Sequence, residues 1–376
     1  MNNVFKRLLL TLLVLPLFAA CTKKTDEILI GEFGSLSGES ATFGLSTNKG
    51  IRMAFDEINA AGGINGKKVK LITIDDQSKD DEAVSAVTRL ITQDKVVAIL
   101  GEVASGRSLA AAPIAQKHQI PMISHASTNP KVTKVGDYIF RTCFIDPFQG
   151  FVNAKFAVET LKAKKAAILR DVKSTYSMGL ADVFNDEFKK MGGQIVADLS
   201  YQEKDIDFKA QLTQLRSKAP DVIFVPGYYG EVGLIALQAR QLGIKAQLLG
   251  GDGWDSTRLH EIGKEAINGG YYSNHYTTEA TDPVVTEFLK KFKEKYNETP
   301  DAMAALGYDA AKILAAAIGR TKEVTSKNIR DEIAKTTDFP GVTGKTTINA
   351  ERNAVKSAVM VQVQGPARKF ISTVAP

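Results

Sequence analysis

The segment from residue 51 to residue 81, IRMAFDEINAAGGINGKKVKLITIDDQSKDD, constrains the fold of this chain more than any other stretch. Its first residues place apolar side chains on one face of a helix: Ile51, Ala54, Phe55 and Ile58. The pair Gly62-Gly63 follows, and glycine readily takes the left-handed conformation that ends a helix. The turn dipeptide Asn65-Gly66 then leads into a strand-like run that ends in two aspartates. The segment therefore predicts a helix, a tight turn and a strand in immediate succession.

The same succession of elements continues along almost the whole chain. Helical periods separate short apolar runs, which we expect to be strands: Ile28–Phe33, Val69–Ile74, Val96–Glu102, Pro121–Ser124, Tyr138–Cys143, Ala166–Asp171, Ile195–Tyr201, Asp221–Gly227, Gln247–Gly251 and Gly270–His275. Alternating strands and helices are typical of βαβ units, so we expect an α/β fold with mainly parallel sheets. The chain has 376 residues, more than one hydrophobic core usually organises, which predicts two lobes. The first lobe should end near Ile145-Asp146.

The first 20 residues are typical of a bacterial signal peptide. Lys6 and Arg7 precede an apolar run that is too short for a membrane-spanning helix. Small residues then precede Cys21, as at a lipoprotein cleavage site, so we expect a signal peptide over 1–20, a lipid on Cys21 and a polar tether over 21–26. A plain secretory signal is the alternative. No later stretch approaches the roughly 18 apolar residues of a membrane span, which predicts a soluble mature chain.

Charge and motifs argue against several classes of function. The net charge of +6 comes from interspersed charges without a basic block, so we expect no nucleic-acid binding. Leu36 stands where a nucleophile elbow needs serine. Phe339 stands where a phosphate loop needs its first glycine. The 4 histidines form no metal-ligand pair at helical spacing, and Cys143 has no candidate base. We therefore expect no enzyme activity, no cofactor and no metal.

Polar residues gather where the predicted strands end. In open parallel sheets, ligands bind beyond the carboxyl ends of the strands, where helix N-termini offer free N–H groups. The first half of the chain places hydroxyl groups there, which suit a carboxylate: Ser105, Ser127 and Thr128. The second half places Asp252 there, which suits an ammonium, together with aromatic residues. The two halves predict a clamp for an amino-acid zwitterion, with Phe43, Tyr228 and Tyr276 around its side chain.

These residues also have purely structural interpretations, which the sequence leaves open. Ser105 and Thr128 are favoured types for helix N-caps. Asp252 lies between two glycines, as a turn residue often does. Phe43 could anchor a loop, and the tyrosines could pack between the lobes. The functional interpretation is favoured because all of these residues follow predicted strands.

The passage over residues 51–81 resembles the type I periplasmic solute-binding proteins, in particular their leucine/isoleucine/valine-binding branch. The run Phe339-Pro-Gly-Val-Thr-Gly344 is similar to a late turn of that family, and the resemblance extends from about Ile28 to Lys369. It implies two Rossmann-like lobes joined by a hinge of three segments. The first lobe would contain residues 27–146 and 275–350. The second lobe would contain residues 147–274 and 351–376.

The resemblance also implies roles for single residues. In the branched-chain amino-acid binders, residues at the positions of Ser105 and Thr128 hold the α-carboxylate of the ligand. The backbone at the position of Ala126 helps to hold the ammonium, and an acidic residue at the position of Asp252 pairs with it. The aromatic positions that match are Phe43, Tyr176 and Tyr228.

Together these observations predict a lipid-anchored, monomeric binding protein on the periplasmic side of a bacterial membrane, or on the cell surface of a single-membrane bacterium. It would close by a hinge motion on a small amino acid, with an aliphatic or branched-chain one favoured, and deliver it to an ABC permease. Two alternatives remain open. One is another polar solute, such as an amide, a urea or an aromatic acid, and the other is a sensor lobe that signals to a partner.

Overall fold

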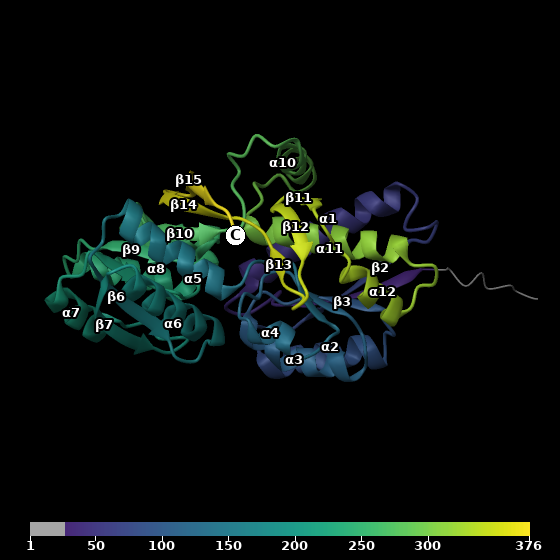
Figure 1. Cartoon of the computed structure of the whole chain (residues 1–376), viewed down its shortest axis with the longest axis horizontal. Helices are drawn as coiled ribbons and strands as arrows, with labels where there is room; N and C mark the ends of the chain where they lie inside the picture. The colour runs from purple at the N-terminus through teal and green to yellow at the C-terminus, as the bar shows by residue number, and fades with distance from the viewer. Residues whose placement is uncertain (1–26) are drawn as a thin grey trace, which may run out of the picture.

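The computed structural model describes residues 27–376, so the expected signal peptide, the tether and Cys21 lie outside the described residues. Two large, mainly parallel sheets lie at opposite ends of an elongated molecule, and helices cover their faces (Figure 1). A small third sheet lies near the segments that connect them (Figure 1). This arrangement confirms the α/β class that strand–helix alternation predicts and the two lobes that the chain length predicts.

The first-lobe sheet has the strand order β2-β1-β3-β4-β5, and all of its pairs are parallel. Its strands are β1 (Ile28–Gly34), β2 (Val69–Asp75), β3 (Ala98–Leu100), β4 (Met122–Ser124) and β5 (Ile139–Arg141). The helices between them are α1 (Ala41–Ala60), α2 (Asp80–Thr92), α3 (Ser105–Lys117) and α4 (Lys131–Lys134). Ile51 and Phe55 of α1 belong to the same buried cluster as Ile30 and Leu100, so the apolar helix face covers this sheet.

The second-lobe sheet has the order β15-β14-β10-β9-β8-β6-β7, with β14 and β15 antiparallel at one edge. Its strands are β6 (Lys165–Asp171), β7 (Gln194–Tyr201), β8 (Val222–Phe224), β9 (Gln247–Gly250), β10 (Tyr271–Asn274), β14 (Ala358–Gln364) and β15 (Ala367–Val374). Its helices are α5 (Asp146–Lys155), the π-helical η1 (Phe156–Thr160), α6 (Thr175–Lys190), α7 (Lys209–Lys218), α8 (Tyr229–Gln241), the short η2 (Asp252–Trp254), α9 (Thr257–Gly263) and η3 (Lys264–Ile267).

The chain passes between the lobes after β5, after β10 and again before β14. The returning segment forms α10 (Pro283–Tyr296), α11 (Ala302–Arg320) and α12 (Ser326–Ile333), of which α11 and α12 lie on the first lobe (Figure 1). It continues into β11 (Phe339–Gly341), β12 (Gly344–Ile348) and β13 (Ala354–Val355) of the small sheet. Because β13 pairs with β12, and Ala354 is buried with first-lobe residues, the last crossing follows β13 rather than residue 351.

Helix α11 is the core helix of the first lobe. By length and composition alone, it is apolar enough to cross a membrane, but 78% of its apolar stretch is buried inside the protein. Two glycines let α1 approach it closely, since a Cβ on Gly50 would lie 2.0 Å from the carbonyl oxygen of Ala304 and one on Gly307 would lie 2.6 Å from that of Thr47. The apolar character of α11 is therefore explained by burial against α1.

Every strand expected from the sequence is present, and its ends differ from the expected ones by a few residues. Helix α1 already begins at Ala41, ahead of the apolar period that starts at Ile51. The strands after residue 275 were not predicted. Strand–helix alternation is absent there, because β11 to β15 follow one another without helices between them.

Candidate ligand-binding site

The two lobes contact each other beyond the carboxyl ends of their strands. Asn129, which follows β4, donates a hydrogen bond from Nδ2 to the carbonyl oxygen of Thr175 at the start of α6, 2.8 Å away. The hydroxyl groups of Thr42 and Ser256 are 3.0 Å apart. Hollows of about 480 and 450 Å³, each lined by residues of both lobes, open beside these two contacts. The residues between them therefore form the walls of a cleft between the lobes.

Asp252 follows β9 and is held by three donors. Its side chain is buried, and Oδ1 accepts hydrogen bonds from Gln149 Nε2 at 2.8 Å and from the Tyr176 hydroxyl at 2.9 Å. Oδ2 lies 3.0 Å from Nε2 of His275. Burial lowers the pKa of His275, so its ring is neutral near pH 7. Nε2 must carry the donated proton, because an ionised carboxylate only accepts. All three partners are neutral, and none of them supplies a cation for Asp252.

Aromatic rings from both lobes stand beside Asp252. Tyr176 stacks on Tyr228 with ring centroids 5.3 Å apart and planes inclined by 10°. Phe43, from α1 of the first lobe, meets the edge of Tyr228 at 5.7 Å and that of Tyr229 at 4.9 Å. Ala126 is buried in the same apolar cluster as Phe43. The structure thus brings Phe43, Tyr176 and Tyr228 together as one wall.

The first lobe contributes hydroxyl groups at the start of α3. Ser105 is buried and its Oγ accepts a hydrogen bond from the backbone N–H of Asn129 at 3.3 Å. Thr128 is also buried, and its hydroxyl faces the carboxyl group of Asp146, where a hydrogen bond opposes the rise in the pKa of that acid. Neither residue is a helix N-cap, since Ala104 precedes α3 and Pro130 precedes α4, so that interpretation is wrong. Ser105 is the first residue of α3, so its hydroxyl lies beside the first N–H groups of that helix, which lack partners within the helix.

The side chain of Ser127 differs from expectation. Its Oγ donates to the carbonyl oxygen of Glu102 at 2.9 Å and lies 2.8 Å from the Ser108 hydroxyl, inside the first lobe. Its carbonyl oxygen accepts from Nη1 of Arg141 at 2.6 Å. The side chain is therefore used to fix the loop after β4 and is not directed at Asp252, because its hydroxyl is already bonded within its own lobe.

Tyr276 also lies apart from the residues around Asp252. Its ring meets Phe288 of α10 at 6.5 Å, and its hydroxyl donates to the carbonyl oxygen of Pro300. It lines a different crevice, of about 380 Å³, together with Asp301 and Arg368. The prediction that Tyr276 surrounds the ligand side chain is therefore wrong, because the ring packs against the returning segment instead.

Sequence reasoning missed Gln149 and His275, which hold Asp252. Adjacent residues at a strand end point to opposite sides, so the sequence could not decide between His275 and Tyr276 without the pleat of β10. Gln149 lies on α5, which follows the first crossing between the lobes, so it is not among the polar residues that directly follow a strand. The only sequence signal for His275 was its position in the run Asn274-His275-Tyr276.

Two further polar groups line the cleft. Asp146 is fully buried, and its carboxyl group lies beside the Thr128 hydroxyl. Burial raises the pKa of Asp146 to about 7, and the charge of Asp252 adds to this rise. The hydrogen bond with Thr128 and the charge of Arg141 oppose it. In the first lobe, Nε of Arg107 lies 3.2 Å from Glu102 Oε1, and both side chains are buried. The cleft therefore contains more ionisable groups than its sequence suggested, and Arg107 is already paired.

Comparison with known proteins agrees with this geometry. Residues 27–368 match a family model described as a periplasmic binding protein. The chain belongs to this family. The leucine-binding protein LivK from Thermotoga maritima is 40% identical, with a TM-score of 0.90 over 93% of this chain and 99% of that chain. LivJ from Streptococcus pneumoniae, a branched-chain amino acid transporter substrate-binding protein solved with isoleucine, is 39% identical, with a TM-score of 0.89 over 93% of this chain and 100% of that chain.

An amino acid binding protein from Pseudomonas aeruginosa is 32% identical over 84% of both chains. The family is one of binding proteins rather than enzymes, which agrees with the failed enzyme motifs. Within residues 27–376, no three histidine, cysteine, aspartate or glutamate residues are grouped so that they could hold a metal ion.

Proposed function

We propose that this binding protein is the extracytoplasmic substrate-binding subunit of an ABC importer and that it binds a small aliphatic amino acid, with leucine, isoleucine and valine as the first candidates. The observation that carries the proposal is the buried carboxylate of Asp252, held by Gln149, Tyr176 and His275. A charge fixed by neutral donors in a closed cleft suits a cationic ligand group, because a buried charge is stabilised by a partner of opposite sign.

The ammonium of an amino acid fits the second-lobe side of the cleft. An ionised carboxylate has about four acceptor sites, and Asp252 uses three of them for the protein. One site remains for an ammonium N–H. The stacked rings of Tyr176 and Tyr228 lie beside Asp252, and aromatic faces also favour a cation over an anion.

The carboxylate of the same ligand fits the first-lobe side. The Ser105 hydroxyl lies at the start of α3 and contacts the N–H of Asn129, the residue after Thr128, and the first N–H groups of that helix offer further donors. A helix N-terminus also carries positive dipole charge, which stabilises an anion. The two ends of the zwitterion are then held by different lobes, so the ligand stabilises their closed arrangement.

The ligand side chain would meet an apolar wall. Phe43, Tyr176 and Tyr228 supply it, and the charge of Arg107 nearby is compensated by Glu102. Glutamate or aspartate would find no free cation for its second carboxylate and should bind poorly. The relatives LivK and LivJ support this choice, since one is called a leucine-binding protein and the other was solved with isoleucine.

The test is calorimetry on the mature protein with leucine, valine, phenylalanine, glutamate and a short amide, preceded by a thermal-shift screen. We expect leucine or valine to bind and glutamate not to bind. In the Asp252→Ala variant, leucine affinity should fall roughly 30- to several-thousand-fold, because one member of a buried charge pair is lost. Glu261→Ala, an exposed acid of the same lobe, is the matched control and should bind normally. Loss of less than about threefold would remove Asp252 from the site, and binding of the amide alone would favour a different polar solute.

We further propose that the protein is a monomer held at the membrane by a lipid on Cys21 and that it delivers its ligand to a permease. Metabolic labelling with a fatty acid tests the anchor. The parent and a Cys143→Ala control should carry the label, while Cys21→Ala should lose it and leave the membrane fraction. Cys143 is a suitable control because it is fully buried. A Cys21→Ala protein that still partitions with membranes would contradict the anchor.

A further inference from the structure

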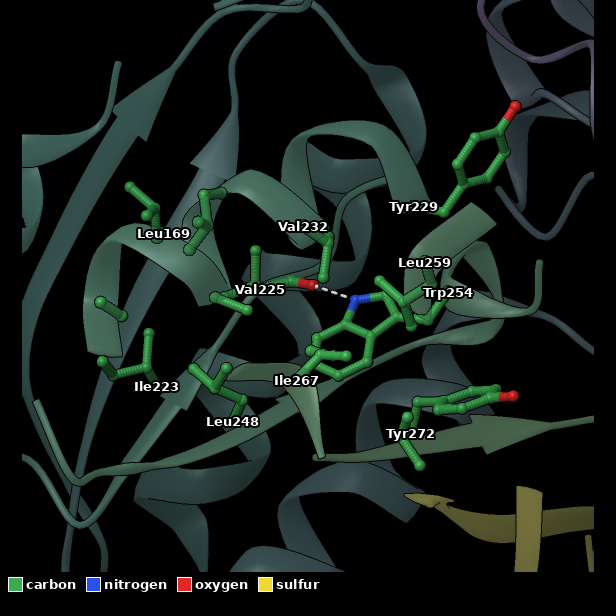
Figure 2. Close-up of a cluster of buried hydrophobic side chains, with 14 of the residues drawn as sticks. Leu169, Ile223, Val225, Tyr229, Val232, Leu248, Trp254, Leu259, Ile267 and Tyr272 are labelled. Carbon is green, nitrogen blue, oxygen red and sulfur yellow. Dashed lines mark hydrogen bonds between the residues drawn. The ribbon is translucent and has the colours of Figure 1, made fainter. Parts of the chain in front are cut away.

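The turn that carries Asp252 also carries a second buried acid, Asp255. The backbone N–H of Asp255 donates to the carbonyl oxygen of Asp252 at 3.0 Å, so both belong to one compact turn. Between them, Trp254 is fully buried, and its Nε1 donates to the carbonyl oxygen of Val225 at 2.9 Å (Figure 2). Figure 2 shows this indole among Val232, Leu259 and other apolar side chains of the second lobe. The turn is therefore seated rigidly in the second-lobe core.

Asp255 contacts the other lobe. Its Oδ2 accepts a hydrogen bond at 2.7 Å from the backbone N–H of Ala302, the first residue of α11 in the first lobe. The first N–H groups of a helix have no partner within it and lie at the positive end of its dipole. The helix's own N-cap, Asp301, accepts instead from Ala304 at 3.0 Å. The N-terminus of α11 is therefore held by two acids, one from each lobe.

The other oxygen of Asp255 is held by its own lobe. Oδ1 accepts from the Tyr272 hydroxyl at 2.7 Å and from Nε of Arg368 at 3.1 Å. Arg368 also donates from Nη2 to the carbonyl oxygen of Ser256 at 2.6 Å, which closes the network around the turn. These bonds fix the direction of the carboxylate, so Oδ2 is oriented towards α11 by second-lobe residues before any contact with the first lobe is needed.

We propose that Asp255 is a positioning residue for ligand binding, which joins the turn that holds the ammonium partner Asp252 to the N-terminus of α11. Closure of the lobes and the placement of Asp252 are then set by one rigid turn. Loss of the contact raises the free energy of the closed arrangement relative to an open one. Ligand affinity falls by that difference although no ligand contact changes. This inference rests on the proposed function, since it assumes that ligand binds the closed lobes.

The variants Asp255→Asn and Ala302→Pro test the contact from both sides. Asparagine keeps the shape and removes the charge. Its single oxygen is needed by the donors Tyr272 and Arg368, so its NH2 group faces Ala302 and cannot accept from that N–H. Proline removes the N–H donor but is favoured at the first position of a helix, so α11 should still form. The matched control is Asp282→Asn, because Asp282 caps α10 of its own segment by accepting from the backbone N–H of Val284 at 2.8 Å. Leucine affinity and its dissociation rate are measured for each protein and for the double variant.

Each single variant should bind leucine roughly three- to thirtyfold more weakly, mostly through faster dissociation. The double variant should be no weaker than the weaker single one, because both remove the same bond. The control should bind like the parent. A merely structural role would lower the fraction of active protein and leave the dissociation rate unchanged. The proposal would be overturned by an unchanged dissociation rate in both single variants. It would also be overturned if the affinity loss of the double variant equalled the product of the two single losses, or if the control lost as much affinity as they do.

Hydrogen exchange at the Ala302 amide separates this proposal from the proposed function. In the ligand-free parent, that amide should exchange slowly, and Asp255→Asn should accelerate it while the Ala304 amide, held by Asp301, is unaffected. If the parent bound none of the amino acids, the proposed function would fail while this experiment still reported on the contact. Equal exchange at Ala302 in parent and variant would overturn the role of Asp255 whatever the ligand.

Discussion

At the scale of single residues, the site depends on how Asp252 is surrounded. An acid between two glycines could equally be a turn residue, and it does begin the short helix η2. What distinguishes it is burial together with three donors from three elements: Gln149 of α5, Tyr176 of α6 and His275 after β10. Each donor both stabilises the charge and fixes the direction in which the remaining acceptor site points.

The Tyr176→Phe variant tests this orientation. It removes one hydroxyl from Asp252 and leaves the stacked ring in place. We expect leucine affinity to fall about tenfold, since a hydrogen bond to a charged group contributes roughly 1.5–3 kcal/mol. Tyr271→Phe, on β10 of the same lobe, is the control, and it should bind normally. Calorimetry measures both, and equal affinities for Tyr176→Phe and the parent would show that the hydroxyl does not orient Asp252.

At the scale of elements, close packing of α1 on α11 places Phe43 at the cleft. Gly50 and Gly307 allow the helix backbones to approach, and Phe43 lies on the same helix as Gly50, nearer the cleft. The apolar sequence of α11 follows from this burial. The positions of α1 and α11 therefore depend on two residues without side chains, which periodicity of apolar residues does not reveal.

Gly50→Ala should destabilise the protein markedly, because its Cβ would lie 2.0 Å from a backbone oxygen that cannot move aside. Overpacking of this kind typically costs about 1–3 kcal/mol. Gly319→Ala is the matched control, since a Cβ there meets nothing closer than Ile64 at 3.8 Å, and alanine favours a helix over glycine by up to about 1 kcal/mol. Thermal unfolding should show a lower midpoint for the first variant and an equal or higher one for the second. Equal midpoints for Gly50→Ala and the parent would contradict the tight contact.

At the scale of the whole molecule, buried carboxyl groups are distributed over both lobes. Burial raises the pKa of Glu32, of Asp76 beside Glu102, and of Asp146 to about 7 in each case. A folded pKa above the unfolded value of about 4 means that the folded protein binds these protons more tightly. The stabilisation is fully present below pH 4 for these groups and is lost as pH rises through about 7.

The ligand-free protein should therefore be more stable at pH 6 than at pH 8. Each group changes the free energy of unfolding by at most about 1.4 kcal/mol per pH unit between its two pKa values. Thermal unfolding at the two pH values measures the difference, and Asp76→Asn should reduce it because one of the titrating groups is removed. A parent that is more stable at pH 8 than at pH 6 would show that these carboxyls are ionised in the folded state with little cost.

The sequence by itself determined the α/β class, the ten strands of the alternating part and the placement of Asp252, Ser105 and Thr128 at strand ends. Those features follow from local patterns, because period, turn residues and strand ends are properties of neighbouring residues. Only the tertiary structure decided that Gln149, 103 positions away, holds Asp252, that Ser127 points into its own lobe and that His275 rather than Tyr276 enters the cleft. These outcomes depend on strand pleat, helix position and lobe contact, which bring distant residues together.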